Sequence, residues 1–229
     1  MSTVSEQVDL HALEPDPFEP TSNEVERYVV ALQGLAEDDP ELAKERVWAQ
    51  IRLAGQRAGR RPEEARDSLN RIFRLGAPPD PAIDGETEGI LVTPVMPGGI
   101  EQGFRGLTNA WMPWAGKRFD SAQSTGDNIL TPSARLPAKV QWPTYTPEEL
   151  PDGRLVAFKF RTYVSPGTVD PDRQTLKIDY DSDENPDFVI RQILDELVQV
   201  VPGANLGKVL MRRGRDKPFG LIGYFALKN

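Results

Sequence analysis

The stretch Leu155-Val-Ala-Phe-Lys-Phe-Arg-Thr-Tyr-Val164 decides the fold class, because apolar and charged side chains alternate along it. Phe158 and Phe160 fall on one face, whereas Lys159 and Arg161 fall on the other. Successive side chains of a β-strand point to opposite faces, so this pattern predicts a strand with one buried face and one solvated face.

Four further segments have the length and composition of strands and are bounded by turn residues. They are Glu86–Thr93, Thr175–Asp181, Leu206–Arg213 and Phe219–Leu227. The last two are joined by a short polar connection and are expected to form a terminal hairpin. Several short strands separated by turn signals are typical of a β-sandwich or a β-barrel.

A helical pattern precedes the strands, and it predicts three helices between residues 21 and 76. Thr21 and Glu24 have the spacing of a capping box at the start of the first helix. Pro40 and Pro62 suit the first positions of the second and third helices.

The chain is expected to divide into three parts. Residues 1–20 alternate prolines with acids and predict a disordered tail. Residues 21–77 form the predicted helical segment, and a proline-rich linker begins directly after it. We therefore assign residues 78–229 to an antiparallel β-barrel domain.

One helix is expected to interrupt the strands. Asn185 suits an N-cap, Pro186 suits a first helical position, and apolar residues follow at helical spacing as far as Val201. Arg191 and Asp195 lie four residues apart, so we predict an ion pair on the exposed surface of this helix.

Charge and composition exclude several classes of function. The formal net charge of −8 disfavours binding to nucleic-acid backbones and to anionic membrane surfaces. The chain has no cysteine, and His11 is its single histidine, so thiolate sites, histidine metal clusters and a Ser-His-Asp triad are excluded. We expect no metal and no cofactor. The N-terminal sequence lacks signal-peptide features, and no apolar run reaches the roughly 18 residues of a membrane span, so we expect a cytoplasmic protein.

The stretch Trp111-Met-Pro-Trp114-Ala-Gly-Lys-Arg-Phe-Asp120 is the main candidate for a functional site. It places two of the chain's four tryptophans beside a glycine, a lysine and an aspartate. Large aromatic residues next to a few fixed polar groups are typical of small-molecule pockets. An ordinary core corner, in which an indole N–H finds a partner, has the same composition.

The segment Trp114-Ala-Gly-Lys-Arg-Phe-Asp120 resembles the W-x-G-K-R-F segment of bacterial lipocalin-like proteins with GXWXG-type domains. Leu206–Met211 followed by Gly223–Leu227 is similar to the closing hairpin of that group. The resemblance implies a small antiparallel barrel of uncertain function and brings no established catalytic residues. We therefore predict an α+β protein in which a three-helix segment precedes an antiparallel lipocalin-like β-barrel with one inserted helix.

The first functional hypothesis is a binding protein that holds a hydrophobic small molecule, for instance a secondary metabolite, inside the barrel. Aromatic side chains would supply the apolar walls, and polar ones would orient the ligand. The candidate ligand-binding residues are Trp111, Trp114, Asn128, Phe158, Phe160 and Arg161.

The alternative is a cofactor-independent isomerase, cyclase or lyase that acts on such a molecule in the same pocket. These reactions need a proton donor and a proton acceptor in an apolar cavity. The candidate catalytic residues are Lys117, Asp120, Tyr180 and Tyr224, and the other carboxylates considered for proton transfer are Asp127, Asp179, Asp195 and Glu196. A third hypothesis, in which the helices dock a partner or form a homo-oligomer, also stays open.

Overall fold

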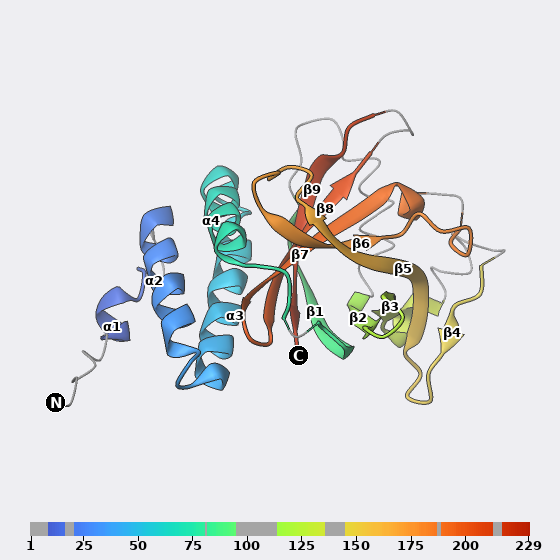
Figure 1. Ribbon diagram of the computed structural model, residues 1–229, viewed down its shortest axis with the longest axis horizontal. Helices are drawn as coiled ribbons and strands as arrows, with labels where there is room; N and C mark the ends of the chain where they lie inside the picture. The colour runs from blue at the N-terminus through green and yellow to red at the C-terminus, as the bar shows by residue number, and fades with distance from the viewer. Residues whose placement is uncertain are drawn as a thin grey trace.

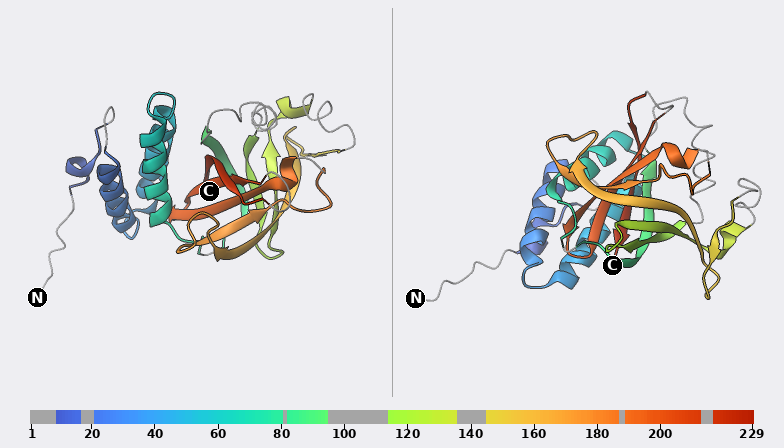
Figure 2. Two further views of the ribbon diagram at one scale, coloured as in Figure 1. Left: turned by 90° about the horizontal axis from the view of Figure 1, so that it is seen from above. Right: turned by 45° about the vertical axis from the view of Figure 1, so that its right-hand side comes forward.

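The computed structural model describes residues 9–16, 21–80, 82–94, 114–135, 145–186, 189–212 and 217–229. A layer of helices lies against one side of a β-barrel, and the two views of Figure 2 show the same arrangement as Figure 1. Trp111, one of the candidate ligand-binding residues, lies outside the described residues.

The helices between residues 21 and 76 begin where the sequence predicts. They are α2 (Ser22–Leu35), α3 (Pro40–Arg57) and α4 (Pro62–Leu75). Thr21 and Glu24 form the capping box of α2 by hydrogen bonding to each other's backbone N–H groups. Within the expected tail, a one-turn helix α1 (Leu10–Leu13) packs its two leucines against the cluster that includes α2. Among the described helices, none is long and apolar enough to cross a bilayer.

Eight antiparallel strands form a closed barrel, and this confirms the predicted α+β class and the barrel. Each barrel strand pairs with the next barrel strand along the chain, β3 pairing with β5, and β9 returns to pair with β1. A two-residue strand, β4 (Glu148–Glu149), pairs with β5 beside this ring. The barrel strands are β1 (Gly85–Pro94), β2 (Trp114–Asp120), β3 (Thr125–Leu130), β5 (Leu155–Pro166), β6 (Gln174–Asp179), β7 (Ile193–Val201), β8 (Ala204–Met211) and β9 (Gly220–Lys228).

The predicted inserted helix is wrong, because its residues form a short 3-10 helix (Val189–Gln192) followed by strand β7. Strand β7 is covered on both faces: Leu197 packs inside the barrel, and Val198 packs against the helices. A strand that is buried on both faces loses the alternation of polarity, so its apolar residues fall by chance at helical spacing.

The helices cover the outer faces of β7, β8, β9 and β1. Val198, Leu206 and Ala226 point outward into the core shared with α2, α3 and α4, whereas Leu197 and Phe225 point into the barrel. The protein therefore has two hydrophobic cores, separated by the barrel wall.

Polar contacts also join the helices to this outer face. The Tyr224 hydroxyl donates a hydrogen bond to Asn70 Oδ1 of α4 at 2.7 Å. Lys208 binds Asp170 at 2.5 Å, and Arg74 of α4 binds the same carboxylate at 2.8 Å. Tyr224, a candidate catalytic residue, is thus on the helix side of the wall and is not part of the barrel interior.

A β-bulge in β2 allows two site residues to face inward together. Trp114 and Lys117 are three positions apart, so in a regular strand they would point to opposite faces. The register of β2 against β3 shifts between Trp114 and Gly116, which restores the inward direction for both. Gly116 has a φ of +149°, and a Cβ built on it would lie 1.9 Å from the carbonyl oxygen of Thr87.

We expect Gly116→Ala to lower the free energy of unfolding by roughly 2–4 kcal/mol, because it adds backbone strain and a clash with β1. The matched control is Gly34→Ala in α2, where an added Cβ meets no atom within 4 Å. That substitution is expected to stabilise the protein by about 0.5–1 kcal/mol through helix propensity. Urea denaturation of the two variants checks both values, and equal stability changes would contradict the role of the bulge.

Candidate functional site

The side chain of Lys117 lies in the barrel interior and is 1% exposed. Its ammonium nitrogen, Nζ, donates hydrogen bonds to Asn128 Oδ1 at 3.0 Å, to Asp195 Oδ2 at 3.0 Å and to the Tyr180 hydroxyl. An ammonium group has three N–H donors, so each donor has an acceptor. We refer to Lys117, Asn128, Tyr180 and Asp195 as the lysine cluster.

The strand register explains why these side chains meet. Asn128 of β3 lies directly opposite Lys117 of β2. Asp195 enters from β7 on the far side of the barrel, and Tyr180 follows the last residue of β6. Four separate segments of the chain therefore contribute one side chain each to a point inside the barrel.

Four aromatic rings surround the ammonium group and form an aromatic cage. The distances from Lys117 Nζ to the ring centroids are 5.5 Å for Trp114, 5.3 Å for Phe160, 4.9 Å for Tyr180 and 5.1 Å for Phe225. A cation within about 6 Å of an aromatic face is attracted by the ring electrons, most strongly where water is excluded. The cage therefore offsets part of the lost hydration of the lysine.

Three of these rings reach the interior because each lies over a glycine of the neighbouring strand. The pairs are Trp114 with Gly89, Phe160 with Gly126 and Phe225 with Gly207, and a Cβ added to the glycine would come within 2.6, 2.5 and 2.1 Å of the ring. Any larger residue at these three positions would compete with the cage for the same space.

The oxygen atoms of the cluster are also connected by further hydrogen bonds, with one exception. The Trp114 indole N–H donates to Asn128 Oδ1 at 3.1 Å, and the Tyr180 hydroxyl lies 3.2 Å from both Asn128 Oδ1 and Asp195 Oδ2. The exception is Asp195 Oδ1, which is buried and receives no hydrogen bond from the described residues.

Burial moves the pKa values of the paired groups toward each other. Removal from water lowers the pKa of Lys117, although the nearby charge of Asp195 opposes this shift. Removal from water likewise raises the pKa of Asp195, against the opposing effect of Lys117. The pKa of Tyr180 is raised well above its ordinary value by burial and by the Asp195 charge, so its hydroxyl keeps its proton.

This arrangement restricts the chemistry of Lys117. All three of its N–H donors are engaged, so an attack by the amine on a carbonyl would first require proton loss and the breaking of these contacts. Asp195 differs because Oδ1 remains an open acceptor. The group most able to bind or to accept a proton from a guest is therefore the carboxylate.

The structure brings together five of the candidate residues that we predicted from sequence. They are Lys117, Tyr180, Trp114, Asn128 and Phe160. Phe158 is also buried in the interior cluster, where its ring stacks on Tyr145 at 5.4 Å between centroids.

Two further candidates lie outside the lysine cluster. Asp120 is exposed at the end of β2 and accepts a hydrogen bond from the backbone of Gln123. Arg161 is exposed on the outer face, where it pairs with Asp179 at 3.4 Å. It alternates with the inward-facing Phe160, so strand geometry turns it away from the interior.

Asp195 is the functional candidate that sequence reasoning considered and then set aside. We predicted an ion pair with Arg191 on a helix surface, but Asp195 is 0% exposed and pairs with Lys117. Arg191 instead binds Asp181 and Asp183 at 3.3 and 2.9 Å. Asp195 could have been identified if residues 193–201 had been interpreted as a strand. In a strand, Asp195 and Leu197 lie on the same face.

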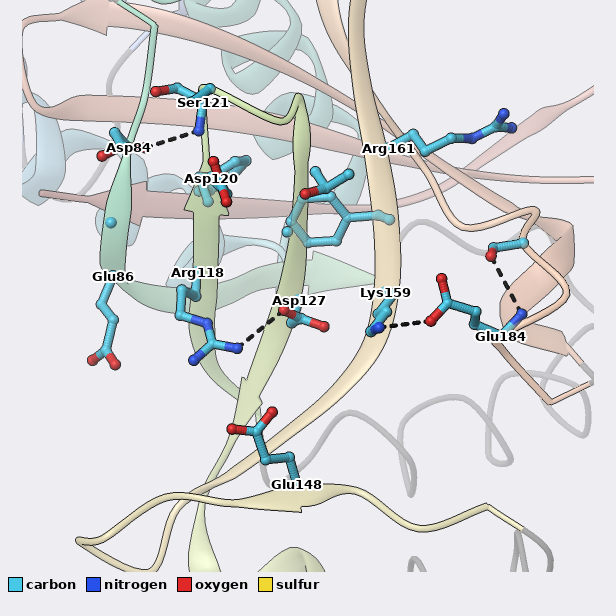
Figure 3. A pocket seen from close by; sticks show the side chains of 17 residues that line it. Asp84, Glu86, Arg118, Asp120, Ser121, Asp127, Glu148, Lys159, Arg161 and Glu184 are labelled. Atoms are coloured by element: carbon cyan, nitrogen blue, oxygen red, sulfur yellow. Dashed lines mark hydrogen bonds and ion pairs between the residues drawn. The ribbon is translucent and has the colours of Figure 1, made fainter.

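A charged cleft of about 920 Å³ lies on the outer face of β2, β3 and β5. Figure 3 shows Arg118 directed at Asp127 and Lys159 directed at Glu184, at 3.2 and 2.6 Å. These pairs account for four of the nine charged residues that line the cleft, and they are exposed to screening by salt. No group of three or more potential metal-binding side chains occurs among the described residues.

No protein-family model and no curated protein matches the chain. Among solved structures, it is similar to one described as the crystal structure of a protein from Thermomonospora curvata, with 17% sequence identity. The alignment covers 77% of this chain and 97% of that chain, with a TM-score of 0.42. The fold follows from the strand pairing described above. The resemblance to GXWXG-type domain proteins stays a prediction.

A double-mutant cycle measures how strongly Lys117 and Asp195 depend on each other. Lys117→Met or Asp195→Leu alone is expected to lower the free energy of unfolding by about 3–5 kcal/mol, because each leaves a buried charge without its partner. The double variant is expected to recover most of this loss, since an apolar pair fills the space without buried charge.

The control cycle uses the exposed pair of Lys159 and Glu184 in Lys159→Met and Glu184→Gln, for which we expect a coupling energy below about 1 kcal/mol. Chemical denaturation provides all the values. A coupling energy for Lys117 and Asp195 no larger than that of the control pair would show that the interior contact is not a tight ion pair.

Proposed function

We propose that the protein binds a hydrophobic small molecule in the barrel interior, with the polar end of that molecule against the lysine cluster. The observation that carries the proposal is a buried polar cluster, Lys117 with Asn128, Tyr180 and Asp195, inside an apolar barrel. Replacing a buried ion pair by apolar side chains of similar volume is often neutral or stabilising, so stability alone does not account for Lys117 and Asp195. A fixed polar point within apolar walls is the usual form of a small-molecule site.

The position of the cluster within the barrel supports this proposal. Strand direction alternates, so the connections β1–β2, β3–β5, β6–β7 and β8–β9 all leave from the same end of the barrel. Trp114 is the first residue of β2 at that end, and Lys117 lies three residues further inside. A guest that enters at this end of the barrel would pass Trp114 before it reaches the lysine cluster, and a secondary metabolite with an apolar body is one such guest.

Two buried tyrosines provide a matched test, because Tyr180 faces the interior and Tyr224 faces the helices. We expect native mass spectrometry of the protein from its own cells to show a bound small molecule. Tyr180→Phe is expected to lower the occupancy of this molecule by roughly tenfold or more, since the cluster loses the hydroxyl that bonds to the charged groups of Lys117 and Asp195. Tyr224→Phe is expected to leave occupancy unchanged. Wild-type protein free of any bound compound, both by mass and after solvent extraction, would contradict the proposal.

The second candidate function is cofactor-independent proton transfer, as in an isomerase, a cyclase or a lyase. The observation that favours it is the convergence of Asp195, Lys117 and Tyr180 at one dry point of the interior. A carboxylate whose pKa is raised by burial accepts a proton more readily near neutral pH, and the adjacent ammonium group stabilises negative charge that develops on the substrate.

Deuterium exchange distinguishes catalysis from binding. If Asp195 acts as a base, the compound extracted from the protein should gain deuterium when it is incubated with wild-type protein in D₂O. The double variant Lys117→Met/Asp195→Leu should slow this exchange by about a hundredfold or more. A compound that returns with unchanged mass and unchanged structure indicates that the protein binds it without catalysis.

A further inference from the structure

We infer that the guest of the barrel presents a neutral hydrogen-bond donor, such as an alcohol or phenol hydroxyl, to Oδ1 of Asp195. This inference rests on the proposed binding function and names the chemical class of the ligand. It follows from the hydrogen-bond inventory of the lysine cluster and from the net charge of that cluster.

The N–H donors of Lys117 and Trp114, and the hydroxyl of Tyr180, all have acceptors within the protein. Lys117 directs its three N–H groups at Asn128, Tyr180 and Asp195, and the indole N–H of Trp114 binds Asn128. The Tyr180 hydroxyl oxygen lies 3.2 Å from both Asn128 Oδ1 and Asp195 Oδ2, so its single proton already has two acceptors in reach. An acceptor group on a guest, such as a ketone or an ester, could bind Lys117, Trp114 or Tyr180 only by displacing one of these contacts.

Asp195, in contrast, has a carboxylate oxygen that lacks a hydrogen-bond donor. Its Oδ2 accepts from Lys117 and Tyr180, whereas its buried Oδ1 receives no hydrogen bond from the described part of the chain. A buried carboxylate oxygen without a donor is costly, so a donor brought by a guest would gain more here than at a hydrated surface.

Charge then selects among the possible donors. Lys117 and Asp195 together are neutral, so an anionic guest would place an unmatched negative charge beside Asp195. A cationic amine would place a second positive charge beside Lys117. A neutral hydroxyl satisfies Oδ1 without adding charge to the dry interior.

The surroundings of Asp195 fit an apolar body on the guest. The residues opposite Asp195 on the two neighbouring strands are Ile178 of β6 and Val209 of β8, and both belong to the interior cluster. Ile193, two positions earlier on β7, faces the same side. The guest is therefore a largely apolar molecule with a hydroxyl at one end.

Matched probes test this class directly by isothermal titration calorimetry. One set consists of 1-naphthol, 1-methoxynaphthalene and 1-naphthoate, and a smaller set consists of phenol, anisole and benzoate. In each set the ring is constant, and the substituent is a donor, a capped oxygen or an anion. We expect the hydroxyl compound of at least one set to bind more than about tenfold tighter than its methoxy and carboxylate partners.

Two double variants test which part of the protein causes the preference for the hydroxyl compound. In Lys117→Met/Asp195→Leu, the hydroxyl and methoxy compounds should bind equally, because the acceptor is gone. Lys159→Met/Glu184→Gln, which alters the outer cleft, should keep the wild-type preference. Perturbation of the indole N–H signal of Trp114 in NMR spectra would place the probe beside the lysine cluster.

The remaining outcomes separate this inference from the proposed function. Equal binding of the hydroxyl and methoxy compounds to wild-type protein would overturn the inference and leave the proposed function standing, as expected if a water molecule satisfies Oδ1. Tighter binding of the carboxylates would overturn it in favour of Lys117 as the anchor. Failure of all six probes to bind would overturn both the inference and the proposed function.

Discussion

Closure of the sheet, through the pairing of β9 with β1 and of β3 with β5, is the constraint on which the rest of the structure depends. In a closed sheet, alternate residues point inward or outward, and a barrel of eight strands has an interior only as wide as a few side chains. A large ring on one strand therefore requires a small residue on the next, as Gly207 provides for Phe225. Such glycine–aromatic pairs shape the interior around Lys117.

Burial of the lysine cluster in this narrow interior has a large free-energy cost. Transfer of an ammonium and a carboxylate out of water costs several kcal/mol for each ion, and only close contacts and further hydrogen bonds compensate for it. Lys117 has that compensation in full, through three acceptors and four aromatic rings, whereas Asp195 has it on one oxygen only. The asymmetry distinguishes a group that is held in place from a group that is still able to bind.

The parts of the fold that sequence reasoning predicted are those with one face in water. In β5, Phe160 points inward and Lys159 points into solvent, so the alternation of polarity is visible in the sequence. The helices α2–α4 were predictable for a similar reason, since caps such as Thr21 and first-turn prolines such as Pro40 and Pro62 mark their starts. Strand β7 lies between two apolar cores and has no solvated face, so no periodicity in its sequence separates it from a helix.

The same limit explains which part of the site was predictable. Lys117 and Trp114 stand out because they share a short segment, and this segment alone indicates a polar group among aromatic residues. Tyr180 and Tyr224 are equivalent by composition, yet a shift of one position in register would exchange inside for outside. Only the pairing of strands shows that Tyr180 faces Asp195 and that Tyr224 faces Asn70.

Two consecutive carboxylates of β7 lie on opposite faces of the barrel wall. Asp195 points into the barrel and pairs with Lys117, and Glu196 points outward and pairs with Lys177. The outer pair is further held by the backbone N–H of Thr168, and the Lys177 ammonium donates to the Thr168 hydroxyl at 3.0 Å, so it fastens the β5–β6 connection to the wall. The inner pair fastens no comparable loop, because Asn128 lies in strand β3 and Tyr180 directly follows β6. A role in anchoring a loop therefore accounts for Glu196, whereas Asp195 needs a different explanation, which the proposed contact with a guest would supply.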